Sequence, residues 1–251
     1  MQMVKLWFSL FDRSDYKSEL PYFIEGSTEA YVEKLESNYA VIKEELLAYL
    51  QKNELTTYFN STMVEKKNTW KTISLNSWDI NLYHNFIHFP KTTALIKSFP
   101  EIVSSSFTML AANSRIKPHC GDTNGIYRCH LGLVIPAGLP SCGFRVGEEW
   151  RSWEEGKVLR FIDANNHEAI NLSDQNRFIF LFDVIRPEVR RKKGFICAVV
   201  RTSLFMQRMA ERMPSLYKCP LSFQMAIAGF LVPLAYTAIP VRNFIYKNMK
   251  W

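Results

Sequence analysis

Six short runs of apolar or alternating residues follow one another between residues 107 and 185, and no helical pattern separates them. Turn-forming residues, such as those of Gly121–Gly125 and Asp163–Asn166, lie between the runs. Strands at this spacing, without intervening helices, are typical of antiparallel sandwiches and jelly rolls. The pattern therefore predicts a mainly β fold. The six runs are Phe107–Ala112, Tyr127–Pro136, Cys142–Val146, Val158–Asp163, His167–Leu172 and Arg177–Ile185.

The region before these strands carries a helical pattern. Apolar residues recur at intervals of three and four from Val32 to Leu50, with charged residues between them. This periodicity predicts one long amphipathic helix that ends near Lys52. Ser27 or Thr28 is the expected N-cap, because a hydroxyl oxygen can accept a hydrogen bond from a free backbone N–H group of the first turn.

A second, shorter helix is predicted from Pro90 to just before Pro100. Of the 251 residues, 47% are apolar and 22% are charged, which is the balance of an ordinary folded protein. We expect a helical N-terminal region over residues 1–69 that packs on the outside of a jelly-roll core. The core is expected over residues 70–190, and a basic and hydrophobic helical tail over residues 191–251.

Positive charge is concentrated late in the chain. The formal net charge is +7, and Arg186–Lys193 and Arg201–Lys218 hold much of the excess. Such segments can face solvent, an anionic lipid surface or nucleic acid. No zinc-finger spacing or aromatic RNA-binding signature accompanies them, so nucleic acid is not an expected partner. Five cysteines without a regular framework, and no signal-peptide pattern in Met3–Phe11, predict reduced thiols and a cytoplasmic location.

Alternation along two predicted strands places charged groups among apolar ones. Arg128 and His130 share one strand face, with the apolar residues of that strand on the other. Arg177 shares its face with Ile179 and Leu181, opposite three phenylalanines. An arginine on an apolar face needs an anionic partner. The alternative is an edge strand from which Arg177 reaches water.

Five histidines are candidates for metal binding. His84 and His88 have i,i+4 spacing but no third ligand nearby, which favours helix-surface residues. His119, His130 and His167 fall inside or beside the strand region. Taken singly, each of these three has the features of an ordinary surface or hydrogen-bonded histidine.

Taken together, the motifs around these histidines resemble the aspartyl/asparaginyl β-hydroxylase family of iron(II)- and 2-oxoglutarate-dependent dioxygenases. The resemblance covers about Trp70 to Glu188, and several motifs occur in the family's order at compatible separations. The densest segments are Lys117–Asn124, Arg128–Pro136, Trp153–Leu159, His167-Glu168, Arg177 and Asp183–Glu188.

The resemblance implies a double-stranded β-helix, cupin-like core, with iron(II) held by His119 and His167. Most non-haem iron oxygenases add a carboxylate two residues after the first histidine. Gly121 stands at that position here, and the family is unusual in the same way, with water in the remaining position. Asp122 is one residue out of register, so we expect a turn residue that binds nearby backbone rather than a ligand.

The resemblance also implies a 2-oxoglutarate site. Arg177 matches the arginine that pairs with the distal carboxylate of the co-substrate, which a guanidinium fork can bind through two parallel hydrogen bonds. Arg128 and His130 match further co-substrate contacts. Thr108 stands where the family has a serine, and Trp70 matches a tryptophan near the same pocket.

The implied reaction consumes dioxygen, converts 2-oxoglutarate to succinate and carbon dioxide, and hydroxylates an unactivated C–H bond. The substrate class stays open between an amino-acid or peptide side chain and a lipid acyl chain, since bacterial members of the family hydroxylate the acyl chains of lipid A. Two alternatives remain. A halide in the iron position near Gly121 would make a halogenase, and loss of activity would leave a jelly-roll binding module.

The tail contains a 23-residue segment without charge, residues 219–241. Its length suits a bilayer, but Pro220, Pro233 and Pro240 make it a poor spanning helix. Basic residues flank both ends, which fits a segment that lies in an anionic membrane surface. The alternative is a helical hairpin that folds onto the domain or onto a dimer partner. The oligomeric state does not follow from the sequence.

Overall fold

Two antiparallel sheets form the centre of the computed structural model, which describes residues 4–12, 14–25, 29–213, 215, 219–247 and 249. The larger sheet contains β1 (Thr56–Thr57), β2 (Trp70–Ser77), β3 (Ile80–Asn81), β4 (Ile102–Leu110), β6 (Ile126–Val134), β9 (Val158–Ile162) and β11 (Arg177–Ile185). The smaller sheet contains β5 (Ser114–His119), β7 (Cys142–Val146), β8 (Glu149–Arg151) and β10 (His167–Asn171).

The strand order identifies a jelly roll. The larger sheet has the order β1-β2-β4-β11-β6-β9, with β3 paired to β2, and the smaller sheet has the order β5-β10-β7-β8. Strands distant in sequence are therefore neighbours, and the second sheet lies over one face of the first. The predicted mainly β, double-stranded β-helix core is confirmed.

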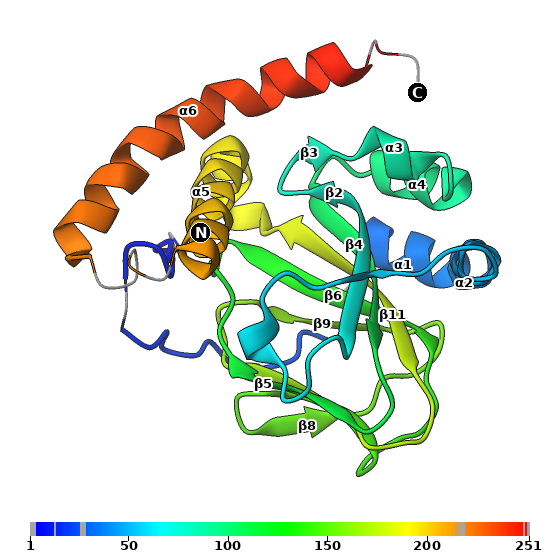
Figure 1. Cartoon of the computed structure of the whole chain (residues 1–251). Coiled ribbons are helices and arrows are strands. Elements are labelled where there is room, and N and C mark those ends of the chain that lie inside the picture. Colours follow the sequence, from blue (N-terminus) through cyan, green and yellow to red (C-terminus); the bar gives the residue numbers. More distant parts are fainter. Residues whose placement is uncertain are drawn as a thin grey trace.

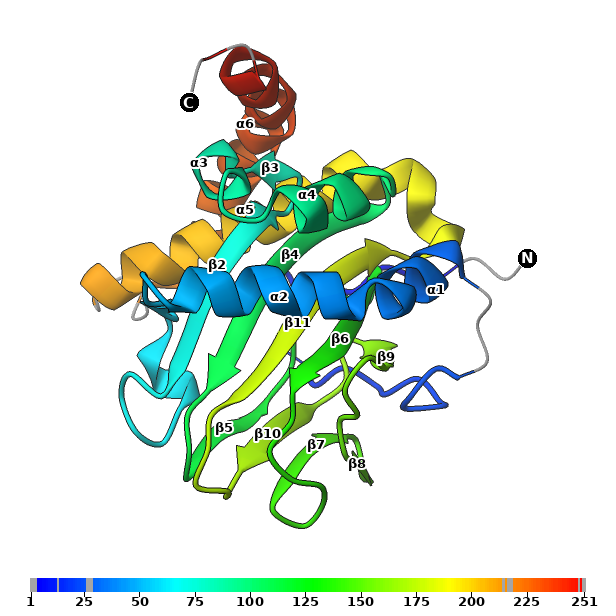
Figure 2. The ribbon, with the colours of Figure 1, turned by 90° about the vertical axis from the view of Figure 1, so that its right-hand side faces the viewer.

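Helices cover the other face of the larger sheet. They are α1 (Ala30–Ser37), α2 (Tyr39–Leu50), α3 (Tyr83–Phe86) and α4 (Pro90–Lys97). Figure 2 shows α1 and α2 lying across the strands of this sheet. Leu35, Ile42 and Leu46 pack there against Leu131 and Phe180, all fully buried. The apolar side of each strand thus meets the apolar stripe of a helix, as the alternation predicts.

The predicted long helix is interrupted. Asn38, with φ −110° and ψ 13°, separates α1 from α2, and its side chain donates a hydrogen bond to the Lys34 carbonyl. The prediction of a single continuous helix was therefore wrong. At Asn38 the backbone leaves the helical conformation, and the side chain bonds to a carbonyl of the preceding turn. The predicted caps, Ser27 and Thr28, lie outside the described residues.

Most predicted strands agree with the structure, and those over Cys142–Val146 and Arg177–Ile185 have the predicted ends. The sequence pattern missed the other five strands, β1, β2, β3, β5 and β8. In β5, two charged residues and Pro118 break any apolar run. An edge position explains how a proline is tolerated there, because one side of an edge strand needs no hydrogen-bond donors.

The tail forms a helical hairpin. A 3-10 helix, η2 (Pro187–Lys192), leads into α5 (Lys193–Arg212), and α6 (Leu221–Lys247) returns across it. Figure 1 shows α6 passing over α5 and reaching the β2–β3 hairpin. The prolines at 233 and 240 do not interrupt α6. Among the described residues, one helix, Ser222–Lys247, is long and apolar enough to cross a membrane, and its most apolar part is only 17% buried.

Candidate active site

One internal pocket between the two sheets brings all seven predicted site residues together. The pocket adjoins a larger cleft of about 720 Å³, and Trp70, Thr108, His119 and Arg128 border both. The seven residues come from β2, β4, β5, β6, β10 and β11, so only the folded sheets can assemble them. They are Trp70, Thr108, His119, Arg128, His130, His167 and Arg177.

The two predicted metal ligands lie directly opposite each other in the smaller sheet. His119 of β5 and His167 of β10 are ladder partners, and their ring centroids are 4.2 Å apart. Nδ1 of His119 lies 2.8 Å from the Lys117 carbonyl, and Nδ1 of His167 lies 2.7 Å from the Asn165 carbonyl. A carbonyl can only accept, so each Nδ1 is the donor. Each Nε2 then carries the lone pair that a metal ion requires.

Burial keeps both imidazoles neutral. It lowers the pKa of His119 to about 4 and the pKa of His167 well below its ordinary value, and the charge of Arg128 acts in the same direction. A neutral imidazole is the form that binds metal. Two adjacent neutral imidazoles with oriented Nδ1 atoms therefore suit a divalent cation such as iron(II).

A carboxylate from another part of the chain fills the space beside Gly121. A Cβ atom added at Gly121 would overlap the carboxylate of Asp163. Asp163 Oδ1 lies 2.6 Å from Nη1 of Arg128 and 4.0 Å from Nε2 of His167. Burial raises the pKa of Asp163 to about 7, and Arg128 opposes that rise. No group of three or more His, Cys, Asp or Glu side chains suited to a metal occurs in the described part of the chain.

Asp122 was expected to bind nearby backbone, and this prediction was wrong. Its carboxylate accepts hydrogen bonds from the Ser9 hydroxyl at 2.9 Å, the Ser203 hydroxyl at 2.6 Å and the Gln207 amide at 3.4 Å. Asp122 thus ties the turn after β5 to the N-terminal segment and α5, instead of to nearby backbone. No sequence pattern predicts that α5 packs over this turn.

Arg177 is the most unusual side chain of the pocket. It is 1% exposed, its guanidinium carbon lies 4.3 Å from the centre of the Trp153 ring, and burial lowers its pKa to about 10. Its Nε and Nη1 atoms have no hydrogen-bond partner among the described residues. The edge-strand alternative is wrong, because β11 lies between β4 and β6. Arg177 therefore presents donors to the pocket instead of to water.

Two more buried polar atoms of the pocket have no hydrogen-bond partner among the described residues. They are Nε2 of His130 and Nε1 of Trp70. Buried polar atoms are normally hydrogen-bonded, so several unsatisfied groups around one pocket indicate a polar ligand. With Arg177 among them, that ligand is expected to carry a negative charge, and a dicarboxylate such as 2-oxoglutarate fits this set.

Arg128 is held by two carboxylates at the border between pocket and cleft. Its Nε and Nη2 donate to the two oxygens of Asp183 at 2.8 and 3.0 Å, and its Nη1 pairs with Asp163. The two carboxylates orient Arg128 before any ligand binds. Thr108 of β4 is buried and borders the same pocket and cleft, and its hydroxyl lies 3.4 Å from that of Ser106.

Three residues of the site were not assigned a role from the sequence. Trp153 donates from Nε1 to Nδ1 of His130 at 3.3 Å and lies under Arg177. Tyr58 stacks on Trp70 with ring centroids 3.8 Å apart. Asp163 is the third. Trp153 lies in one of the family's motifs and Asp163 lies in a predicted turn. Neither segment has an alternating or helical pattern from which the direction of a side chain can be predicted.

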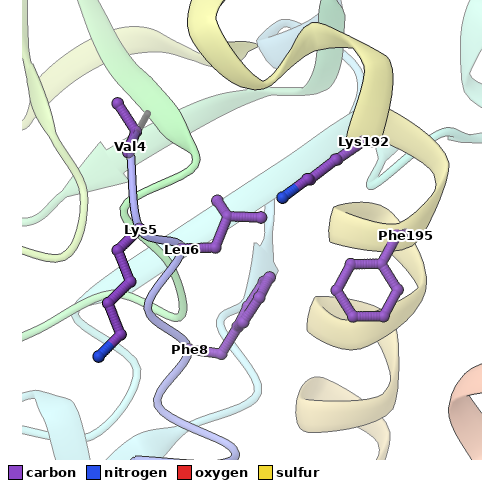
Figure 3. Close-up of a pocket in the computed structure, with 6 residues that line it drawn as sticks. All are labelled: Val4, Lys5, Leu6, Phe8, Lys192 and Phe195. Carbon is purple, nitrogen blue, oxygen red and sulfur yellow. The ribbon is translucent and has the colours of Figure 1, made fainter. Parts of the chain in front are cut away.

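A second cavity of similar size lies between the N-terminal segment and the start of α5. Figure 3 shows Leu6 and Phe8 on one side and Phe195 of α5 on the other. Its lining, completed by Val4, Lys5 and Lys192, contains no His, Cys, Asp or Glu side chain. Its charged side chains are the two lysines, and none of the seven predicted site residues lines it.

Comparison with known proteins connects this geometry to a family. A family model described as aspartyl/asparaginyl beta-hydroxylase matches residues 36–187, more than half of the chain. The chain belongs to the aspartyl/asparaginyl β-hydroxylase family. The matched residues contain all seven lining residues named above, and they end before α5 and α6.

Relatives in this family include two hydroxylases. The ornithine lipid ester-linked acyl 2-hydroxylase of Rhizobium tropici is 31% identical over 172 residues, which cover 66% of this chain and 61% of that protein. The human aspartyl/asparaginyl beta-hydroxylase is 33% identical over 169 residues, which cover 65% of this chain and 22% of that protein. The chain thus spans less than two thirds of the length of either relative.

A solved structure gives a distant comparison. A prolyl-4-hydroxylase from Pseudomonas putida covers 62% of this chain and 97% of its own, with 11% identity and a TM-score of 0.43.

Proposed function

We propose that this protein is an iron(II)- and 2-oxoglutarate-dependent dioxygenase that hydroxylates an unactivated C–H bond. The observation that carries the proposal is the buried, unpaired guanidinium of Arg177 in the same pocket as the His119–His167 pair. A cation binds next to neutral imidazoles and an anion binds next to an arginine, so the pocket suits a metal ion chelated by an anionic co-substrate.

Each side chain has a distinct task in this proposal. His119 and His167 would hold iron(II) through Nε2, and Arg177 would bind the distal carboxylate of 2-oxoglutarate with its free donors. His130, Trp70 and Thr108 would bind or position the rest of the co-substrate. When bound, iron(II) and 2-oxoglutarate would activate dioxygen, which is the oxidant: one oxygen atom would enter succinate and the other would become the hydroxyl group of the product. The surrounding core, which includes Phe144 and Phe161, excludes water from the reaction.

The Asp163 carboxylate weighs against the halogenase alternative. It occupies the space beside Gly121, where a halide would have to bind near the metal. A buried carboxylate repels a second anion unless it is protonated. The names of the relatives likewise favour hydroxylation over an inactive binding module.

The test is anaerobic addition of iron(II) and 2-oxoglutarate, with detection of the visible charge-transfer band that their chelate gives. We expect the band in the wild-type protein and in His88→Ala, a control at an exposed histidine that borders neither cavity. We expect no band in His119→Ala or His167→Ala. Equal bands in all four proteins would refute the metal assignment.

We also propose that α6 lies on an anionic membrane surface, which places the protein peripherally on the inner face of a membrane. Ala228, Val232 and Ile239 form its buried stripe against the protein, with 0–8% exposure. A spanning helix would have to give up these contacts. The opposite side exposes a second apolar stripe, and Arg242 and Lys247 lie in the last turns of the helix. The exposed stripe consists of Phe223, Phe230, Leu234, Val241 and Ile245, which are 51–73% exposed.

Vesicle pelleting separates the alternatives for this stripe. We expect wild-type protein to pellet with anionic vesicles at low salt, and deletion of residues 219–251 or the pair Phe230→Glu and Leu234→Glu to abolish pelleting. Leu20→Glu, at an apolar residue that is 74% exposed outside α6, is the matched control. Wild-type protein that never pellets, and that forms a dimer which the α6 variants dissociate, would show that the stripe binds a second copy.

A further inference from the structure

One wall of the cleft is a face of α5. Arg201, Leu204, Phe205 and Arg208 all line the cleft, and their spacing of three and four residues places them on one side of the helix. His119 lines the same cleft. The family match ends at residue 187, so this wall lies outside the matched region. It can therefore give this protein a specificity that the family's common core does not encode.

Among the described residues, the two arginines of this wall have no carboxylate partner. No Asp or Glu oxygen lies within 4.0 Å of Arg201 or Arg208 among the described residues, whereas Arg128, Arg145 and Arg186 each have one. Arg201 donates a hydrogen bond to the Ser77 hydroxyl at 3.3 Å. Burial and the charges of Arg208 and Arg242 lower the pKa of Arg201. Cations that repel each other at the edge of a cleft form a binding site for an anion.

Aromatic contacts connect this wall to the co-substrate pocket. The Arg208 guanidinium lies 4.7 Å from the Phe59 ring, Phe59 lies 4.8 Å from Tyr58, and Tyr58 lies 3.8 Å from Trp70. These three short steps place Arg208 within the reach of one acyl chain from the pocket. Phe205, which is 52% exposed, adds an apolar surface on the same wall.

We propose that Arg201 and Arg208 bind the phosphate or carboxylate headgroup of an acyl lipid whose chain extends along the cleft toward His119. The inference rests on the proposed hydroxylase function and names its substrate class. The floor of the cleft provides hydroxyl groups for the polar part of such a lipid, from Ser74 of β2 and Ser106 of β4.

The position of α6 favours a lipid over an acidic peptide. The β2–β3 hairpin that contributes Ser77 to the cleft is hydrogen-bonded to α6, because Asn81 N donates to Asn243 Oδ1 at 3.2 Å and Arg242 donates to the Asn81 carbonyl at 3.0 Å. The cleft wall on α5 and the exposed apolar stripe of α6 are therefore joined, both through the β2–β3 hairpin and through the packing of α6 on α5. A lipid could pass from a membrane under α6 into the cleft.

The experiment measures binding of dodecyl phosphate, below its micelle concentration, to the full chain. Arg201→Gln with Arg208→Gln should weaken binding roughly tenfold to a hundredfold, because charge-assisted hydrogen bonds to the headgroup are lost. Arg212→Gln removes the same charge from the last turn of α5, outside the cleft lining, and should stay within about twofold of wild type. Dodecyl maltoside, which is neutral, should bind all these proteins alike.

Three results would overturn the inference. They are a double variant that binds dodecyl phosphate like wild type, inorganic phosphate that binds as tightly as dodecyl phosphate, and an acidic peptide that binds more tightly than either. The first result would exclude the two arginines as the headgroup site. The second would exclude a contribution of the acyl chain to binding, and the third would exclude a lipid as the preferred ligand. The iron(II) and 2-oxoglutarate band is recorded for each protein. Its absence from the wild type would sink the hydroxylase proposal, while the binding data alone decide the headgroup site.

Discussion

Replacing Arg177 with methionine tests the co-substrate site most directly, because the structure predicts opposite effects on stability and on ligand binding. A buried cation without a carboxylate costs free energy in the absence of ligand. Burial lowers the pKa of Arg177 from its ordinary value to about 10, and this depression corresponds to a cost of about 3 kcal/mol. Arg177→Met also removes the cation–π contact with Trp153, which offsets about 1 kcal/mol of the stability gained by removing the buried charge. We expect Arg177→Met to raise the unfolding free energy of the ligand-free protein by about 1 to 3 kcal/mol.

The assay is urea unfolding with and without 2-oxoglutarate, in the presence of manganese(II) as a substitute for iron(II). A co-substrate present at about 100 times its Kd stabilises the wild type by about 2.7 kcal/mol. The Arg177→Met variant should show almost none of this gain. Arg177→Lys should recover part of it, because an ammonium group cannot form the two parallel bonds of a guanidinium.

A second buried arginine provides the matched control. Arg186 is 5% exposed, but its Nη1 lies 3.0 Å from Glu19 Oε2 and 3.2 Å from the Asn124 carbonyl. Arg186→Met breaks these bonds, so it should destabilise the ligand-free protein and leave stabilisation by 2-oxoglutarate intact. If Arg177→Met destabilises the protein as Arg186→Met does, and 2-oxoglutarate still stabilises it, the reasoning about Arg177 is refuted.

Other substitutions near the metal site give distinct results. Gly121→Ala should lower the unfolding free energy by about 1 to 3 kcal/mol through overlap with Asp163, and the loss should vanish in an Asp163→Ala background; additive effects would contradict the overlap. Asp122→Ala should destabilise the fold by about 1 to 3 kcal/mol, since two serine hydroxyls lose their acceptor, yet keep the iron(II) band. A band lost as in the histidine variants would make Asp122 a ligand. Because burial lowers the pKa of His119 to about 4, its imidazole stays neutral at pH values well above 4. Iron(II) retention at about pH 5.5 should therefore equal that at neutral pH, and half-loss near pH 6.5 would indicate an ordinary histidine.

The sequence predicted the strands whose two faces differ in polarity. Around Cys129 and Phe180, strict alternation marks one face for the helices, and both residues are buried beneath α1 and α2. The same alternation assigns His130 and Arg177 to the opposite face, where the second sheet covers them. A strand's period of two residues is local, so it can be read without knowing the partner strands.

The strand that carries His119 could not be found in this way. β5 is an edge strand whose residues alternate between buried and exposed positions, and they include Arg115, Lys117 and Pro118. Its apolar content is too low to give a pattern. The role of His119 came from family resemblance, and the structure adds its position opposite His167.

The sequence by itself determined the alternating strands, the amphipathic helices and the order of the family's motifs, because each depends on residues close together in the chain. Only the tertiary structure decided that Asp163 fills the space beside Gly121, that Asp122 binds α5 and that Arg201 and Arg208 face the cleft. These are contacts between segments far apart in sequence. Their geometry depends on how sheets and helices pack, and no local period records it.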